Sequence, residues 1–349
     1  MNKPKEIAKL FSGGRITFAI LIGLSVSIYL MIKDSSWSDF QTINFSLLAI
    51  VFILLAITME TLRDIAYMYR IRLLTDKVID WKKSFQVIML WEFASALTPS
   101  VVGGSAVALF IVDKEINNVG KSTAIVMITA LLDELFYIIM VPLSFLFIGD
   151  NELFINTEFN IFGWGQFPTK LVFFMGYGFI LILTSIIFIA VFFRPKLFKL
   201  VLTTLFSIRL IRRWHNKAIK VGDDIIITSH ELKGKSVWFW AKLFGLTIVS
   251  WTARFAVINM LIMIVNGHEN QILIFARQLI MWVILLISPT PGGSGIAEYM
   301  LPKFLGEFTG AYSNEIALSW RLLSYYSYLI IGSIVLPLWL RRVFVKDKL

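Results

Sequence analysis

Residues 288–298 read Ser-Pro-Thr-Pro-Gly-Gly-Ser-Gly-Ile-Ala-Glu and lie between two strongly apolar segments. The two prolines remove backbone hydrogen-bond donors, and the three glycines admit backbone angles that other residues avoid. A membrane helix cannot run through this stretch, so we expect a break here. Residues 97–106, Leu-Thr-Pro-Ser-Val-Val-Gly-Gly-Ser-Ala, resemble it more weakly and predict a second break.

The composition is that of a polytopic integral membrane protein. Hydrophobic residues make up 57% of the 349 residues and charged residues only 16%, against roughly 45–50% and about 25% in soluble domains. The net charge of +10 comes from bases in short loops beside apolar spans, as in cytoplasmic loops, so we expect no nucleic acid partner. The chain has no cysteine, and its three histidines match no ligand spacing, so we expect neither a metal nor a cofactor.

The apolar segments differ in length, and only some can cross a bilayer. Six full spans are predicted, near residues 16–32, 44–66, 121–148, 170–193, 237–265 and 314–340. The basic N-terminus precedes an apolar run without a cleavage site, so we interpret it as an uncleaved first span. The segment that begins near Phe85 breaks after about 14 residues, roughly 21 Å of helix, which is short of the 30 Å hydrocarbon core. We interpret it as one arm of a re-entrant hairpin that follows a short amphipathic piece at 70–83.

The positive-inside rule gives the orientation. It places the N-terminus, 67–83, 194–235 and the C-terminus inside, and 33–43 and the polar loop 149–169 outside. The two broken segments then open on opposite sides of the membrane. We therefore predict an all-α polytopic fold of about six full transmembrane helices plus two oppositely oriented re-entrant hairpins, arranged as an inverted repeat. Residues 1–349 form one membrane domain, with repeat cores at 84–148 and 271–340 and a basic cytoplasmic amphipathic segment at 194–235.

Broken helices at membrane depth indicate a transport site. The short helices after the breaks, near 101–112 and 295–305, present free N–H groups and a partial positive charge that suit an anion, above all phosphate. The candidate substrate-binding residues are Thr98, Ser100, Gly103, Gly104, Ser105, Thr290, Pro291, Gly292, Gly293, Ser294, Glu298 and Arg321. Alternatively, the glycines serve only close packing of helices.

Ionisable residues inside the membrane are functional candidates. For gating or proton coupling the sequence offers Glu92, Asp133, Glu134, Arg254 and Arg277. The expected partners of the acids are Arg254, Arg277 and Arg321, and the alternative is that these charges only neutralise one another. Glu60, Arg63 and Asp64, near the inner end of the second span, are interpreted as a solvated cluster.

Several of these residues resemble one known family. Thr98-Pro99 with Gly103-Gly104, Leu132-Asp133, the run Pro289-Thr290-Pro291-Gly292-Gly293-Ser294-Gly295 with Glu298, and Arg321 with Tyr325-Tyr326 resemble the transmembrane region of lysylphosphatidylglycerol synthases. That domain also occurs as stand-alone flippase-like membrane proteins, and the likeness covers about residues 12–340. The chain departs from the family pattern at Ser100-Val101, at Ser105 and at Glu134.

The resemblance implies movement of an anionic or modified phospholipid, or of a polyprenyl-phosphate-linked lipid, between the leaflets of the bacterial inner membrane. The aminoacyl-transferase domain of the full synthases would need several hundred further residues, so we expect a transporter and not an enzyme. The expected partners are the membrane lipid as substrate and either a second copy of the chain or a lipid-biosynthesis enzyme. The alternatives are an integral-membrane lipid-modifying transferase that uses Asp223-Asp224, and a membrane subunit of a lipid or glycan biosynthesis complex.

Overall fold

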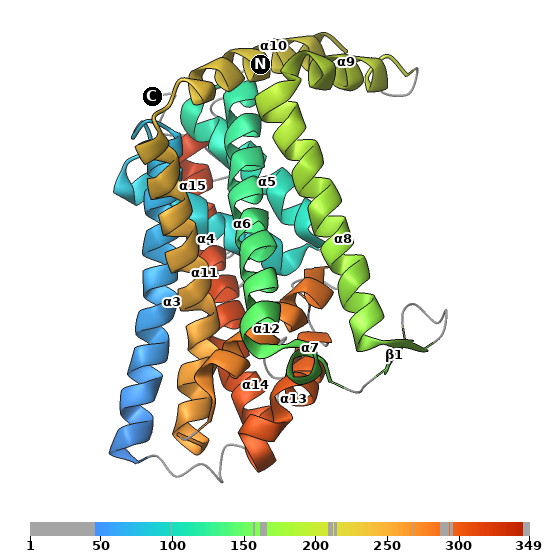
Figure 1. Cartoon of the computed structure of the whole chain (residues 1–349). Coiled ribbons are helices and arrows are strands. Elements are labelled where there is room, and N and C mark those ends of the chain that lie inside the picture. The colour runs from blue at the N-terminus through green and yellow to red at the C-terminus, as the bar shows by residue number, and fades with distance from the viewer. Residues whose placement is uncertain are drawn as a thin grey trace. The chain divides into compact units, whose positions relative to one another are not determined.

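The computed structural model describes residues 46–98, 100–155, 158–160, 166–208, 212, 215–267, 269–286, 293 and 296–344, with only the backbone at 100–103 and 159–160 (Figure 1). The predicted span at 16–32 lies outside the described residues. The chain divides into two compact units. The first unit holds Met1–Leu62, Phe85–Val107 and Ala253–Leu349, and the second holds Arg63–Ser84 and Ala108–Thr252.

The second unit is built on long apolar helices. Its elements are α3 Leu47–Leu74 from Arg63 onward, α6 Val119–Ile148, α7 Asp150–Leu153, β1 Glu158–Asn160, β2 Gln166–Pro168, α8 Thr169–Phe188, the π-helix η2 Ile189–Phe193, α9 Pro195–Leu205, α10 His215–Lys233 and the first half of α11 Val237–Val265. The side chain of Asn118 caps α6 by accepting a hydrogen bond from the backbone N–H of Lys121 at 2.8 Å, which satisfies an N–H that the helix itself leaves unpaired.

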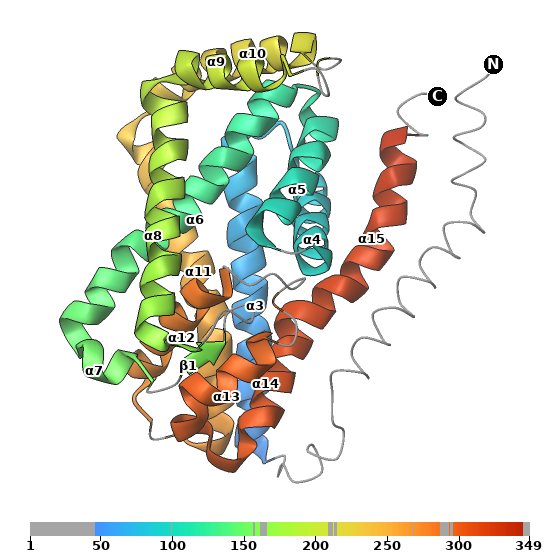
Figure 2. The same ribbon diagram turned by 90° about the vertical axis from the view of Figure 1, so that its right-hand side faces the viewer.

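At one end of this unit, α9 and α10 lie side by side and run across the axis of α8 (Figures 1 and 2). At the other end, β1 and β2 pair antiparallel with Glu158 opposite Pro168. The sequence predicted only a polar loop at 149–169, and the structure adds α7 and this short hairpin. Phe145, Phe154 and Phe173 pack their rings together beneath it, with Phe145 and Phe154 5.7 Å apart.

The first unit contains two pairs of short helices and a long bent one. Its elements are the first part of α3, α4 Trp81–Leu97 from Phe85 onward, the start of α5 Ser100–Ile116, the second part of α11, α12 Gln271–Leu286, α13 Ile296–Thr309, the 3₁₀ turn η4 Gly310–Tyr312, α14 Ser313–Arg321, the π-helix η5 Leu322–Tyr326 and α15 Ser327–Phe344. The hydroxyl of Tyr328 donates to Glu60 at 2.7 Å and that of Tyr325 to the carbonyl of Ala96 at 3.3 Å. Through these two hydrogen bonds η5 and α15, which continue one another, are joined to α4 and α3.

Both predicted helix breaks are present. Helix α4 ends at Leu97 and α5 begins at Ser100, while α12 ends at Leu286 and α13 begins at Ile296. Each of these helices has 14 to 17 residues, or about 21–26 Å, less than the roughly 30 Å of a hydrocarbon core. In the described part of the chain, four helical stretches are long and apolar enough to cross a membrane: Val119–Ile148, Thr169–Phe193, Val237–Val265 and Ile296–Phe344.

Two expectations for α3 were wrong. The helix does not give way to an amphipathic piece at residue 70, because it continues to Leu74 with Arg70 and Ile71 buried. The cluster at its middle is not solvated, since Arg63 and Glu60 are both buried. Arg63 lies 3.1 Å from Asp64 and over the ring of Tyr67, and these contacts replace the water that the sequence interpretation assumed.

Candidate functional site

The second break joins two antiparallel helices of the first unit, α12 and α13 (Figure 2). Arg277 of α12 donates to the carbonyl of Phe304 at 3.2 Å and pairs with Glu307 at 2.7 Å, so the ends of the two helices far from the break are held together. At the break, Gly293 has φ +67°, a backbone conformation that favours glycine. Its carbonyl accepts from the N–H of Ala297 at 2.8 Å and so begins α13. The other predicted tip residues, Thr290, Pro291, Gly292 and Ser294, lie outside the described residues.

Glu298 and Arg321 meet at the N-terminal end of α13. Glu298 lies in the first turn of the helix, and its Oε1 lies 2.5 Å from Nε of Arg321 at the end of α14. The side chain of Arg321 is 5% exposed and that of Glu298 is 23% exposed. The guanidinium also stacks over the ring of Tyr325 at 3.7 Å. A carboxylate in the first turn complements the partial positive charge of a helix N-terminus, and here it receives an arginine as well.

The first break joins α4 and α5. A Cβ built on Gly104 would overlap the side chain of Ser95, so the two helices approach each other closely there. At the other end of the pair, Lys83 and Glu115 lie 3.9 Å apart. The Thr98 hydroxyl donates to the carbonyl of Ala94 at 2.7 Å, within its own helix. The contact at Gly104 agrees with the packing alternative for this glycine.

Four more of the predicted residues belong to α4 and α5. The structure gives only the backbone of Ser100 and Gly103, and it leaves Glu92 and Ser105 half-buried.

A second polar cluster lies in the second unit, on α3, α6 and α11. Arg70 holds Asp133 with both terminal nitrogens, at 2.6 and 3.0 Å, and also donates to Thr247 at 2.8 Å. The indole of Trp251 donates to the same carboxylate at 2.9 Å. The guanidinium of Arg70 lies 4.5 Å from the centre of the Tyr67 ring. Asp133 is thereby supplied with three donors from two other helices.

This pairing differs from the expected one. The partner of Asp133 is Arg70, whereas Arg254, Arg277 or Arg321 was expected from the sequence. Sequence reasoning missed Arg70, Thr247 and Trp251, because a base near the end of an apolar helix usually marks the membrane surface. Only the amphipathic position of Arg70 beside Tyr67, one turn apart, could have hinted at burial. Glu134, next to Asp133, is also buried.

The other predicted charges are distributed as follows. Arg254 lies over the ring of Trp282 at 4.5 Å, and Arg277 belongs to the α12–α13 pair described above. Asp223 pairs with Lys199 at 2.5 Å, and Asp224 packs against Gly120 of α6. Both members of the Asp223-Asp224 pair therefore contact a neighbouring helix. Within the described ranges, no group of three or more His, Asp or Glu side chains is placed to hold a metal ion.

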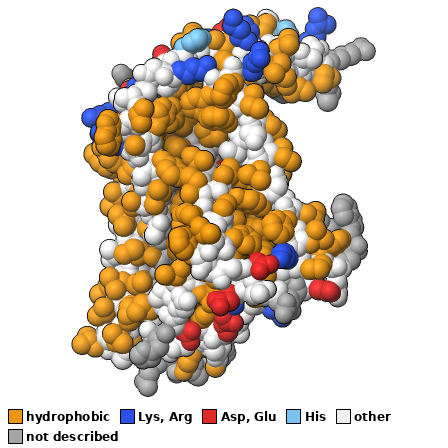
Figure 3. All heavy atoms as spheres, viewed as in Figure 1, with side chains coloured by type: hydrophobic (Ala, Val, Ile, Leu, Met, Phe, Trp, Pro, Cys, Tyr) orange, Lys and Arg blue, Asp and Glu red, His pale blue; other side chains and the backbone are white. Residues whose placement is uncertain are grey.

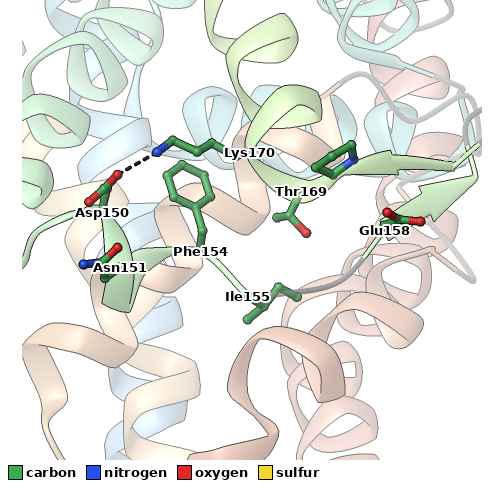
Figure 4. A pocket seen from close by; sticks show the side chains of 8 residues that line it. Asp150, Asn151, Phe154, Ile155, Glu158, Thr169 and Lys170 are labelled. Atoms are coloured by element: carbon green, nitrogen blue, oxygen red, sulfur yellow. Dashed lines mark hydrogen bonds and ion pairs between the residues drawn. The ribbon is translucent and has the colours of Figure 1, made fainter.

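The second unit also has a cavity of about 600 Å³ at the start of α8 (Figure 4). Asp150, Phe154, Glu158 and Lys170 are among its lining residues. Lys170 pairs with Asp150 at 2.6 Å and lies 5.7 Å from the centre of the Phe154 ring. Hydrogen bonding to Lys170 holds the pKa of Asp150 below its ordinary value. The cavity lies at the end of α8 opposite to α9, because α8 and η2 separate the two.

Together these features define a polytopic membrane protein with short paired helices and long apolar ones. The chain belongs to the family described as the lysylphosphatidylglycerol synthase TM region, whose model matches residues 16–332. This confirms the resemblance that the sequence carried. The chain is similar to a UPF0104 membrane protein of Archaeoglobus fulgidus, at 25% identity over 341 residues that cover 91% of this chain and 94% of that protein. No solved structure matches the chain.

Proposed function

We propose that this protein is a flippase-like lipid transporter that moves an anionic or modified phospholipid, or a polyprenyl-phosphate-linked lipid, between the leaflets of the cytoplasmic membrane. The lipid phosphate binds between the N-termini of α5 and α13, which both belong to the first unit. The α4–α5 and α12–α13 pairs act as two re-entrant hairpins of opposite orientation, and six full spans surround them. The protein carries out no covalent chemistry.

The observation that carries the proposal is the ion pair between Glu298 and Arg321. Glu298 places a carboxylate in the first turn of α13 and within 2.5 Å of Arg321. A phosphate is an anion like the Glu298 carboxylate, and helix N-termini and arginines both bind anionic oxygens. Glu298 therefore pairs with Arg321 when no lipid is bound, and an entering lipid phosphate competes with Glu298 for the guanidinium. The family membership supports a role with lipids.

The arrangement of charges supports the proposed orientation. Arg194 directly precedes α9 and Lys196 lies in its first turn, just after the apolar α8 and η2. Asp150 and Glu152 lie in α7, before the opposite end of α8. Bases gather on the cytoplasmic side of membrane proteins. The end with α9 and α10 is thus assigned to the cytoplasm, and the basic residues near both termini assign these to the cytoplasm as well.

The test is leaflet exchange in proteoliposomes with labelled lipids. The panel compares phosphatidylglycerol, phosphatidylcholine and a polyprenyl phosphate, so that anionic phospholipids and polyprenyl-linked lipids are distinguished. Arg321→Ala should reduce exchange at least tenfold, the effect of losing about 1.4 kcal/mol of binding in the rate-limiting state. Glu298→Ala should change the rate in the same assay, whereas Lys303→Ala on the exposed part of α13 should not.

Two results would count against this assignment. If the purified protein moves none of the lipids, the transport function is wrong. If exchange occurs but Arg321→Ala and Glu298→Ala match the unaltered protein, transport stands and the site is wrong. Arg321→Lys keeps the charge but lacks the flat guanidinium that stacks on Tyr325. We therefore expect its exchange rate to lie between those of Arg321→Ala and the unaltered protein.

A further inference from the structure

Helix α9 has an apolar face with no cover from the rest of the second unit. Leu197, Leu200, Val201 and Leu205 are each between 48% and 60% exposed. At 100° per residue these four positions fall within an arc of about 140° on one side of the helix. Large apolar side chains gathered on one face in this way mark a surface that binds another apolar phase or partner.

The opposite face of α9 is occupied by α10. The methylene groups of Lys199 lie so close to Gly222 that a Cβ there would overlap them. The ammonium of Lys199 pairs with Asp223 at 2.5 Å. Helix α9 is therefore fixed in rotation about its own axis, and its apolar face points away from α10.

The chain places α9 at a membrane surface. The stretch Thr169–Phe193 is one of the four that can cross a bilayer, and α9 begins only two residues after it, at Pro195. Arg194 turns the chain there with φ −130° and ψ 53°. Both views show α9 running across the axis of α8 (Figures 1 and 2). A helix so close to the end of a span, and across its axis, lies at the level of the lipid headgroups.

Exposed bases flank the apolar face. Arg194, directly before α9, and Lys196, in its first turn, are both exposed, and Lys217 lies exposed on α10. Figure 3 shows lysine and arginine side chains gathered over the end that carries α9 and α10. An amphipathic helix with an apolar face and flanking bases is the pattern of helices that lie in the interface of membranes with anionic lipids.

We infer that α9 is an interfacial helix whose apolar face enters the boundary between acyl chains and headgroups, while the flanking bases bind the phosphates of anionic lipids in that leaflet. These lipids are a second lipid contact, separate from the proposed transport site. The bilayer itself covers the apolar face, because α9 begins two residues after a span and so cannot move away from the membrane surface. Each base near an anionic surface raises the affinity for that surface by about fivefold.

The absence of cysteine from the sequence makes the test direct, since single cysteines can be introduced and spin-labelled. Leu200→Cys and Leu205→Cys report on the apolar face, and Lys220→Cys on α10 is the matched polar control. Each is reconstituted as the full chain in nanodiscs of phosphatidylcholine alone or with phosphatidylglycerol. Accessibility to oxygen and to a water-soluble nickel chelate gives the depth of the label.

We expect labels at 200 and 205 to be shielded from nickel and open to oxygen, roughly 5–10 Å inside the interface, and the label at 220 to be open to nickel. Anionic lipid should deepen the labels at 200 and 205. In a titration with phosphatidylglycerol, Arg194→Gln with Lys196→Gln should raise the lipid concentration at the midpoint, by about fivefold for each base that is removed. Lys303→Gln should leave the midpoint unchanged.

Three outcomes would overturn the inference. Equal nickel accessibility at 200 and 220 would place the face in water. Dipolar coupling between labels at 200 on two chains would show that a second copy covers it. An unchanged midpoint after removal of both bases would show that the anionic lipid binds elsewhere. None of these readouts depends on lipid exchange, so the inference and the proposed function can fail separately.

Discussion

Arg70 and Asp133, 63 residues apart in the sequence, form a bidentate ion pair that joins α3 to α6. The two Nη–Oδ distances are 2.6 and 3.0 Å. Trp251 adds a donor from α11. The pair is shielded from water on the arginine side, where the side chain is 2% exposed, and less so on the aspartate side, at 21%. Three helices of the second unit thus depend on one carboxylate.

Removal of one member of this pair should be more harmful than removal of both. Arg70→Met leaves the Asp133 carboxylate with fewer donors in a largely dry setting, and we expect a loss of roughly 3 kcal/mol in the free energy of unfolding. Arg70→Met with Asp133→Leu removes both charges and should recover most of that loss. Unfolding in detergent or bicelles measures both variants. A single variant as stable as the unaltered protein would contradict a structural role for the pair.

The brace between α12 and α13 should depend on Arg277 more than on Glu307. Glu307 is 53% exposed, so Glu307→Gln should cost less than about 1 kcal/mol. Arg277→Ala also removes a charged hydrogen bond to Phe304 and a contact with the Phe308 ring at 5.2 Å. We expect it to cost about 1.5–3 kcal/mol. The two variants are compared in the same unfolding assay, and equal losses would show that the salt bridge alone holds the helices.

Gly332 should not tolerate a side chain. A Cβ at this position of α15 would overlap ring atoms of Phe93 in α4, and overpacking of this kind costs about 1–3 kcal/mol. Gly178 in α8 is the matched control, because a Cβ there meets nothing within 4 Å. Gly178→Ala should therefore be neutral or slightly stabilising.

The partner residue gives a check on this explanation. In the Gly332→Ala background, Phe93→Leu should restore part of the stability by making room for the new methyl group. If the second substitution only adds to the loss, the Phe93 ring is not the source of the clash. Thermal unfolding of the unaltered protein, Gly332→Ala, Phe93→Leu and the double variant provides the comparison.

Asp76 should link stability to acid pH. Burial alone raises the pKa of Asp76, but the hydrogen bond to Lys235 and the charges of Lys235 and Lys121 outweigh it and lower the pKa. The unfolded value is about 3.9. The stabilisation is therefore present above about pH 4 and is lost as the pH falls through the lower folded value. It stays below about 1 kcal/mol, because the side chain is 45% exposed and solvent screens the pair.

Asp76→Asn isolates this contribution. It should be slightly less stable than the unaltered protein at pH 7, and the difference should shrink towards zero near pH 3. The measurement is the unfolding free energy at both pH values in low salt. A difference that grows on acidification would reverse the assigned sign.

The sequence predicted the helix breaks because their cause is local. Pro99 lacks a backbone donor, and the Pro-Gly run before Ile296 combines two such losses with glycines that disfavour a helix, so the ends of α4 and α12 follow from chemistry within a few residues. The pairing of Glu298 with Arg321 was also within reach, since both are charges in apolar surroundings close to one break.

Other features depend on contacts between distant segments. Arg70 has the sequence context of a surface base, and only the presence of Asp133 and Trp251 explains its burial. The strands β1 and β2 have only 3 residues each, too few for a periodic pattern to separate them from a loop.

The π-helix η5, Leu322–Tyr326, lies between Arg321 and Tyr328, and each of these residues is held by a different partner. A π turn accommodates extra residues relative to an α turn, so α14 and α15 are out of helical register with each other. Conversion of this turn to α geometry would rotate Arg321 by roughly 100° per residue about the helix axis, while Tyr328 stayed on Glu60. Such a conversion would therefore turn α14 relative to α15 and carry Arg321 away from Glu298.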